Sequence, residues 1–353
     1  MPPSAPLTLQ QILWADFKIS FGLIAAMLVV FYIGRKLAEK GDRVARVSGL
    51  GGSWVGLVLL ACATSMPELV TGVATAGVVG APDLAVGNIM GSCLFNLAII
   101  ALMDLLWRKG PVLLEVSRSQ ERPALFGIAL LCLGAAGIYF VAPDRLARDW
   151  GLGFGAALVI GYIVSVRMLF ERKSSQTVES AEDKKRKAER SQAFRAFGWW
   201  ALWMIVAGLF LSWIGDEISR HKFGPTRFTF GATWVGTFFL AFATSLPELS
   251  VSISAVRLGA VEMAVGNVLG SNLFNVAILP ICETAARIAQ RPAVFYNASP
   301  IHLLTAGASI LMTAVVYVAI KRRSSRQIGG MAPETILVAI IYIAASVGIF
   351  ILS

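Results

Sequence analysis

Histidine and cysteine, the residues that most often bind transition metals or form disulfides, are scarce in this chain. It has two histidines and four cysteines in 353 residues. Cys62, Cys93, Cys132 and Cys282 all fall within apolar stretches and lack metal-ligand spacing, so we expect neither a zinc site nor a disulfide framework. The chain also lacks a Walker A sequence, a cofactor motif and a nucleophile–base pair. These absences argue against an enzyme, a bound cofactor and nucleotide-driven pumping.

Charged residues make up only 15% of the chain, whereas 56% of the residues are hydrophobic and the mean hydropathy is +0.71. A soluble core of this size could not bury so much apolar surface, so we expect an all-α integral membrane protein. Stretches long enough to cross about 30 Å of hydrocarbon as transmembrane helices are expected in ten places. They lie near residues 17–33, 50–78, 83–107, 123–142, 151–170, 198–215, 229–258, 262–284, 300–320 and 334–352.

The net charge of +10 comes from basic residues that gather on one side of this ten-helix arrangement. When the loops are assigned to alternate sides, 23 of the 31 lysines and arginines fall on one side and 8 on the other. Basic loops stay in the cytoplasm, so both termini are predicted to be extracytoplasmic and the central loop cytoplasmic. The charge therefore predicts a lipid bilayer as the partner, and not a nucleic acid.

Two segments of the chain occur twice. Trp54–Leu69 matches Trp234–Leu249, 180 positions later, at 11 of 16 positions, and both copies contain Ala-Thr-Ser-x-Pro-Glu-Leu. Ala85–Ile99 matches Ala264–Ile278 at 11 of 15 positions, and both copies contain Ala-Val-Gly-Asn-x-x-Gly-Ser-x-Leu-Phe-Asn. A carboxylate, a proline and several small polar residues within an apolar span are costly in a membrane, which favours a functional role for them.

The duplication predicts two five-helix repeats of opposite orientation, because an odd number of spans makes the second half enter the membrane from the other face. We expect a first repeat at residues 1–170, with its motif region at about 50–107, and a second repeat at 198–353, with its motif region at about 229–284. The hydrophilic residues 171–197 are expected to form a cytoplasmic linker. In transporters built from inverted repeats the substrate lies near the midplane, where helices are interrupted.

Pro67 and Pro247 are expected to break the second and seventh helices just before Glu68 and Glu248. A proline has no amide hydrogen, and its ring clashes with the carbonyl four residues earlier. Backbone carbonyls around Ala61 to Thr64 and Ala241 to Thr244 would then be available as ligands. Such broken helices are tolerated at membrane depth only where they are buried in protein or line a cavity.

Small polar side chains follow at helical spacing in the next span of each repeat. Asn88, Ser92 and Asn96 are spaced i, i+4, i+8 and so share one helix face, and Asn267, Ser271 and Asn275 repeat the pattern. The paired glycines beside them, Gly87 and Gly91, and Gly266 and Gly270, should let this face approach the broken helix closely. Asn88 and Asn267 have an alternative role as interhelical hydrogen-bonding groups without ion contact.

The resulting set of oxygen atoms suits Ca²⁺, which takes 6–8 oxygen ligands, better than softer metals, which favour imidazole or thiolate. Glu68 and Glu248 supply a charge of −2, which one Ca²⁺, two Na⁺ or two protons neutralise. If only a neutralised site can be occluded in the membrane interior, the protein changes state only when loaded, and obligatory exchange follows.

These motifs resemble the cation/calcium antiporter (CaCA) superfamily, most closely its sodium/calcium exchanger branch, and the similarity covers most of the chain. The resemblance implies a metal site in which Glu68 and Glu248 coordinate the ions and helices one and six are sliding gates. The other ligands it implies are Thr64, Thr244, Ser65, Ser245, Ser92, Ser271, Asn96 and Asn275, and the helix breaks add the carbonyls of Ala61 and Ala241. Several relatives, including potassium-dependent exchangers, have Asp where this chain has Asn275, which disfavours potassium coupling here. Cys93 stands where many relatives have an amide, as this chain does at Asn272 in the second repeat.

The function expected from the sequence is a secondary antiporter that expels Ca²⁺ in exchange for Na⁺, in a prokaryotic plasma (inner) membrane. A Ca²⁺/H⁺ exchanger is the alternative counter-ion hypothesis, since protons compete with cations for carboxylates. A cation channel and a membrane scaffold without transport are the alternatives of a different class. Asp104 and Glu283, near helix ends, are expected to be interfacial, and His221 and His302 are not expected to form a proton relay.

Overall fold

The computed structural model describes residues 9–141, 149–169, 181–220, 238 and 240–352. Within these residues the regular elements are helices, beside one isolated β-bridge between Ile328 and Met331. The first half contains α1 (Leu9–Ser48), α2 (Gly52–Trp54), η1 (Val55–Leu60), α3 (Ala61–Thr64), α4 (Met66–Val73), η2 (Ala74–Val79), α5 (Pro82–Leu106), η3 (Val112–Leu114), η4 (Arg118–Gln120), α6 (Glu121–Phe140) and α7 (Trp150–Leu169). The second half contains α8 (Ala181–Arg220), α10 (Ala241–Thr244), α11 (Leu246–Arg257), α12 (Val261–Ile288), α13 (Val294–Asn297), α14 (Ile301–Arg322) and α15 (Pro333–Leu352).

Nine helical runs within the described residues are long and apolar enough to cross a membrane. They agree with nine of the ten spans expected from hydropathy, most of them to within a few residues at each end. The seventh expected span, 229–258, lies partly outside the described residues, and its described part consists of α10 and α11. The described spans thus have the order that two five-helix repeats require.

Both duplicated Pro-Glu segments interrupt their helices, as the prolines predict. The break falls at Ser65 (φ −89°, ψ 8°) between α3 and α4, and at Ser245 (φ −90°, ψ 5°) between α10 and α11. Each proline takes a position in the first turn of the following helix, where its missing amide hydrogen costs nothing. The two breaks have nearly the same backbone geometry because they have nearly the same sequence.

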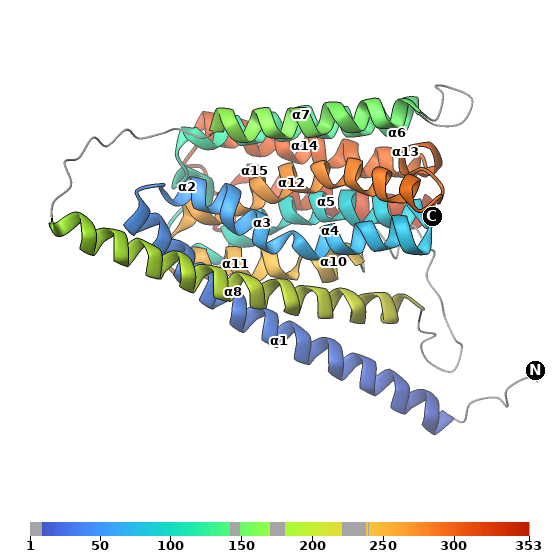
Figure 1. Cartoon of the computed structure of the whole chain (residues 1–353). Helices are drawn as coiled ribbons and strands as arrows, with labels where there is room; N and C mark the ends of the chain where they lie inside the picture. The colour runs from blue at the N-terminus through green and yellow to red at the C-terminus, as the bar shows by residue number, and fades with distance from the viewer. Residues whose placement is uncertain (1–8, 142–148, 170–180, 221–237, 239, 353) are drawn as a thin grey trace, which may run out of the picture.

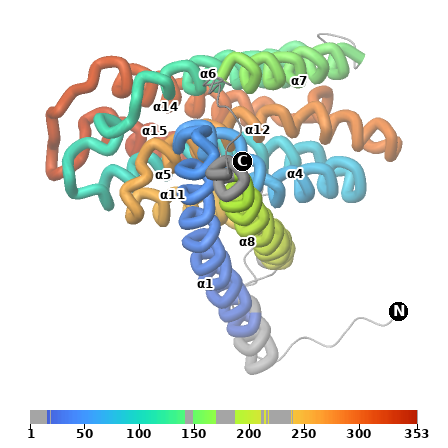
Figure 2. Tube along the Cα trace, turned by 60° about the vertical axis from the view of Figure 1, so that its left-hand side comes forward, coloured from blue at the N-terminus to red at the C-terminus, as the bar shows by residue number. Residues whose placement is uncertain are grey.

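Helices α5 and α12 lie at the centre of the molecule and are buried along most of their length (Figure 1). Helices α1 and α8 pack side by side along one face of the remaining helices and extend beyond them (Figure 2). α1 exposes large apolar side chains such as Phe21 and Leu28, and α8 exposes Trp199 and Phe210. Each of these two helices therefore has one exposed apolar side and one side packed against other helices.

The glycines of α12 bring this helix into backbone contact with η1. A Cβ atom on Gly270 would overlap the backbone of Leu57, and one on Gly266 would come within 2.8 Å of the Ser53 carbonyl oxygen. This confirms the close approach predicted for the second repeat. The residues equivalent to Ser53 and Leu57 in the other half, 233 and 237, lie outside the described residues.

The boundary between the halves differs from the expected linker, residues 171–197. α8 begins at Ala181, well before the apolar span that starts near residue 198. The sequence from Ala181 to Arg190 consists of alanine and charged residues with high helix propensity, so nothing stops the membrane helix from continuing into the polar segment. α1, the helix that packs beside α8, ends at Ser48. The next residue, Gly49, has φ +72°, a left-handed conformation that suits glycine.

Candidate functional site

The two broken helices place Glu68 and Glu248 in the interior of the molecule. Each glutamate lies in the first turn of the helix that follows the break, α4 for Glu68 and α11 for Glu248, and neither is exposed to solvent. The amide groups at a helix N-terminus carry a partial positive charge, which favours a carboxylate in the first turn.

The serines at the two breaks connect the repeats to each other. Ser65 Oγ donates a hydrogen bond to Glu248 Oε1 at 2.7 Å, and Ser245 Oγ donates one to Glu68 Oε1 at 2.9 Å. Each glutamate is therefore held by the break of the opposite repeat. This reciprocal pattern is what a two-fold axis between the repeats requires.

The polar faces of α5 and α12 complete the surroundings of the glutamates. Ser92 Oγ donates to Glu68 Oε1 at 3.4 Å, and Ser271 Oγ donates to Glu248 Oε1 at 3.3 Å. The same oxygen of each carboxylate thus accepts both hydroxyl groups. The other oxygen, Oε2 of Glu68 and Oε2 of Glu248, is buried without a hydrogen-bond partner.

Thr64 and Thr244 bind asparagines of the opposite repeat. Thr244 Oγ1 donates to Asn88 Oδ1 at 3.0 Å, and Thr64 Oγ1 lies 3.4 Å from Asn267 Oδ1. The first asparagine of each polar face therefore supports a threonine, which fits the interhelical role considered for Asn88 and Asn267. Asn267 Nδ2 also donates to Ser252 Oγ at 3.1 Å.

The last asparagine of each polar face has unsatisfied oxygen atoms. Asn96 and Asn275 are fully buried, and the Oδ1 atom of each has no hydrogen-bond partner. Asn275 Nδ2 is also without a partner. Buried polar atoms normally find partners, so these amide oxygens, like the two Oε2 atoms, are available to a ligand.

The carbonyl oxygens of Ala61 and Ala241 already accept hydrogen bonds. Each accepts the amide of the break serine four residues later, at 3.0 Å in both repeats. The residues four positions after Ala63 and Ala243 are prolines, which have no amide hydrogen, so these two carbonyls lack that helical hydrogen bond. All twelve side chains and carbonyl groups predicted as ligands thus belong to residues that are buried, at the two breaks and the two polar faces.

The chemistry of this set suits a hard cation. In the part of the chain that the structure describes, neither Glu68 nor Glu248 forms an ion pair with a basic side chain, and no cluster of three or more His, Cys, Asp or Glu residues occurs. The available atoms are carboxylate, amide and hydroxyl oxygens, which are the ligands of alkali and alkaline-earth ions. A buried charge of −2 without a basic partner requires cations or protons to balance it.

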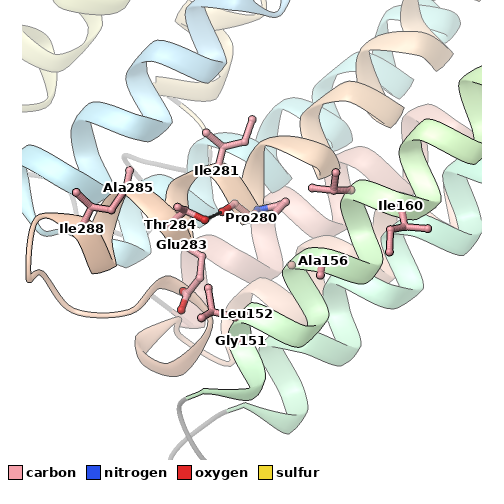
Figure 3. Close-up of a pocket in the computed structure, with 12 residues that line it drawn as sticks. Gly151, Leu152, Ala156, Ile160, Pro280, Ile281, Glu283, Thr284, Ala285 and Ile288 are labelled. Carbon is pink, nitrogen blue, oxygen red and sulfur yellow. Dashed lines mark hydrogen bonds between the residues drawn. The ribbon is translucent and has the colours of Figure 1, made fainter.

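Asp104 and Glu283 are buried but have other partners. Asp104 accepts the amides of Val112 at 2.6 Å and Ala332 at 2.7 Å. Glu283 accepts the amide of Val294 at 2.6 Å and pairs with Arg287 at 2.6 Å. Figure 3 shows Glu283 beside an apolar groove of about 600 Å³ between α7 and α12. Both carboxylates therefore hold loops and helix starts near the ends of α5 and α12, and sequence reasoning had not identified these partners.

His302 is buried at the start of α14, and its Nε2 lies 3.3 Å from Asp83 Oδ1. His221 lies outside the described residues.

Comparisons with known proteins give consistent similarities. A family model described as "Sodium/calcium exchanger protein" matches residues 18–170 and residues 193–350. The chain is 29% identical over 263 residues to the inner membrane protein YrbG of Escherichia coli (strain K12), which covers 73% of this chain and 76% of that protein. It is 49% identical over 47 residues, 13% of each chain, to the sodium/calcium exchanger MaX1 of Methanosarcina acetivorans. A solved structure of the sodium-calcium exchanger NCX_Mj superposes with a TM-score of 0.68 at 20% identity, covering 93% of this chain and 98% of that one. At this identity the superposition establishes a common fold.

Proposed function

The chain belongs to the sodium/calcium exchanger protein family, and we propose that it is a secondary antiporter that expels Ca²⁺ in exchange for Na⁺ by alternating access at one central site. The resemblance drawn from the duplicated motifs is thereby confirmed at the level of the family, which consists of membrane antiporters of cations and not of enzymes. The choice of ions and the roles of single residues go beyond family membership.

One observation carries the proposal. Glu68 and Glu248 are fully buried, each keeps one carboxylate oxygen without a partner, and neither pairs with a basic side chain among the described residues. One Ca²⁺ or two Na⁺ would neutralise this pair, so the two ions compete for the same carboxylates. Competition for one site, with passage between states only when the site is neutralised, produces exchange.

The ligands that we propose are the twelve expected from the sequence. Glu68 and Glu248 would bind Ca²⁺ directly, with the hydroxyl and amide oxygens around them completing the 6–8 ligands that the ion takes. These further ligands are Thr64, Thr244, Ser65, Ser245, Ser92, Ser271, Asn96, Asn275 and the carbonyls of Ala61 and Ala241. The mirrored contacts of the two glutamates support this set, because each serine hydroxyl bond to Glu68 has a counterpart to Glu248.

The proposed gate consists of α1 and α8, which would slide along the central helices to open the site to either side. Gly208 of α8 supports this role, since a Cβ atom there would overlap Pro67 and would come within 3.4 Å of Pro247. α8 therefore lies directly over both breaks. The second gate helix, α1, contacts α11: Ser250 of α11 donates hydrogen bonds to the α1 carbonyls of Val30 at 3.1 Å and Phe31 at 3.2 Å.

The chain is an integral membrane protein, and we propose a prokaryotic inner membrane with both termini extracytoplasmic. The distribution of lysine and arginine supports this orientation. The division into repeats at 1–170 and 198–353 is supported by the two separate stretches that the family model matches. The segment between them would be cytoplasmic, with the first turns of α8 included in it.

Uptake of ⁴⁵Ca²⁺ into proteoliposomes tests the counter-ion. The proposal predicts uptake under an imposed outward Na⁺ gradient and none under a pH gradient alone. Uptake that only the pH gradient supports would instead establish Ca²⁺/H⁺ exchange. Flux that continues without any counter-ion on the opposite side would identify a channel, and no Ca²⁺ movement under any gradient would refute transport of Ca²⁺.

A further inference from the structure

Cys93 and Asn272 face each other where α5 and α12 cross. They are equivalent positions of the two repeats, since Cys93 follows Ser92 and Asn272 follows Ser271. Asn272 Nδ2 donates a hydrogen bond to the backbone carbonyl of Cys93 at 3.1 Å, and Cys93 Sγ donates to the carbonyl of Asn272 at 3.9 Å. Each side chain therefore bonds to the backbone of its counterpart.

The bond to the Cys93 carbonyl fixes the orientation of the Asn272 amide. A carbonyl oxygen only accepts hydrogen bonds, so the amide nitrogen of Asn272 has to face it and Oδ1 has to face the other way. That oxygen meets Asn96, whose Nδ2 donates to it at 3.1 Å. The Asn96 amide is fixed in turn, because only its nitrogen can donate to Asn272 Oδ1. Its own Oδ1 is thus the atom left buried without a partner.

The equivalent asparagine of the second repeat lacks this support. Asn275 occupies the position of Asn96, and the residue that would orient it is Cys93, whose thiol provides no amide oxygen. Both amide atoms of Asn275 are without a hydrogen-bond partner. The two sides of the candidate site therefore differ, with one asparagine held in a single orientation and the other not held.

We propose that Asn272 is a positioning residue that keeps Oδ1 of Asn96, and not its NH₂ group, directed at the transported cation. This inference rests on the proposed function, in which Asn96 is a ligand of Ca²⁺. An amide that turns by half a revolution presents hydrogen atoms to the cation and repels it. Groups that orient a ligand in this way contribute roughly 10- to 100-fold to metal affinity.

The first test replaces Asn272 by cysteine, the residue at the equivalent position of the first repeat. In proteoliposomes that carry an outward Na⁺ gradient, Asn272→Cys is expected to raise the KM for Ca²⁺ about tenfold and to leave the maximal rate within about twofold of the wild type. Cys93→Ala is the matched control, since it removes a buried side chain at the same crossing but keeps the backbone carbonyl that Asn272 uses. Its KM should equal that of the wild type.

A double-mutant cycle separates positioning from a merely structural role. A carboxylate at position 96 presents oxygen in either orientation, so in the Asn96→Asp background the further change Asn272→Cys should no longer raise the KM for Ca²⁺. Equilibrium ⁴⁵Ca²⁺ binding to the purified protein should show the same loss of the effect. Asn272→Ala removes the same oxygen and serves in the same cycle if the cysteine variant does not fold.

An equal rise in KM in both backgrounds, or no rise in either, would overturn the positioning role while the wild type still exchanges Ca²⁺. If the wild type neither binds nor transports Ca²⁺, the proposed function fails and this inference fails with it. The two failures are therefore distinguished by the wild-type measurement alone.

Discussion

Replacing either buried glutamate by glutamine should abolish Ca²⁺ exchange. In Glu68→Gln or Glu248→Gln the site keeps one negative charge, so a bound Ca²⁺ leaves a charge of +1 without a counter-charge in the protein interior. Breaking a buried charge pair by removing one partner costs about 3–5 kcal/mol. Since about 1.4 kcal/mol changes an equilibrium constant tenfold, Ca²⁺ affinity should fall by roughly two to four orders of magnitude.

The same charge balance predicts a selective defect. One Na⁺ still neutralises a site of charge −1, so exchange of ²²Na⁺ for Na⁺ should retain a larger share of its wild-type rate than uptake of ⁴⁵Ca²⁺ does. Both fluxes are measured in proteoliposomes with equal amounts of reconstituted protein. A variant that simply misfolds would lose both fluxes equally.

Glu262→Gln provides the matched control. Glu262 lies in the first turn of α12, the helix that carries Ser271, and accepts the amide of Ser117 at 2.7 Å on an exposed loop. Its loss should leave the KM for Ca²⁺ within about twofold of the wild type, because it lies outside the candidate site. The reasoning is refuted if either Glu68→Gln or Glu248→Gln keeps Ca²⁺ uptake within about tenfold of the wild type, since the charge argument predicts a far larger loss.

Three further outcomes follow from the structure. Gly208→Ala should slow exchange because its methyl group would collide with Pro67, whereas Gly198→Ala in the same helix, with open space around it, should not. Turnover in proteoliposomes measures both variants, and equal rates would contradict the placement of α8 over the breaks. Asp104→Asn should lower the free energy of unfolding by about 1–3 kcal/mol, because its new NH₂ group would face the backbone amide of Val112 or Ala332. Thermal unfolding in detergent checks this prediction. An unchanged melting temperature with an altered KM for Ca²⁺ would place Asp104 in the transport site instead. Acidification should raise the KM for Ca²⁺ because protons occupy the same carboxylates, and a KM that is constant between acidic and neutral pH would contradict direct binding to them.

The broken helices and the polar faces of the site could be predicted from the sequence. Proline at positions 67 and 247 removes an amide hydrogen wherever the helix lies, so the breaks required no knowledge of tertiary structure. Spacing of i, i+4, i+8 likewise determines which asparagines and serines share a face. These are local rules, and the inverted repeats followed from counting the spans.

The pairings between helices could not be predicted in the same way. Helical spacing tells which residues lie on a face but not which residue of another helix they meet, so the bonds from Ser65 to Glu248 and from Asn96 to Asn272 required the tertiary arrangement. Asp104 bonds to an amide 228 positions away, for which no sequence signal exists. Asn272 had one available signal, its difference from Cys93 in an otherwise repeated motif.

Departures from symmetry between the repeats bear on which state the protein adopts at rest. In transporters of inverted repeats the two halves exchange conformations between the inward- and outward-open states, so identical halves would give two states of equal energy. Here Ser252 accepts a hydrogen bond from Asn267, whereas its counterpart in the first repeat is Gly72, and Asn88 Nδ2 has no partner. A net hydrogen bond contributes about 1 kcal/mol, which changes a ratio of populations about fivefold. If the protein alternates between two states as proposed, the few positions at which the repeats differ, and not the many at which they agree, would set the balance between them.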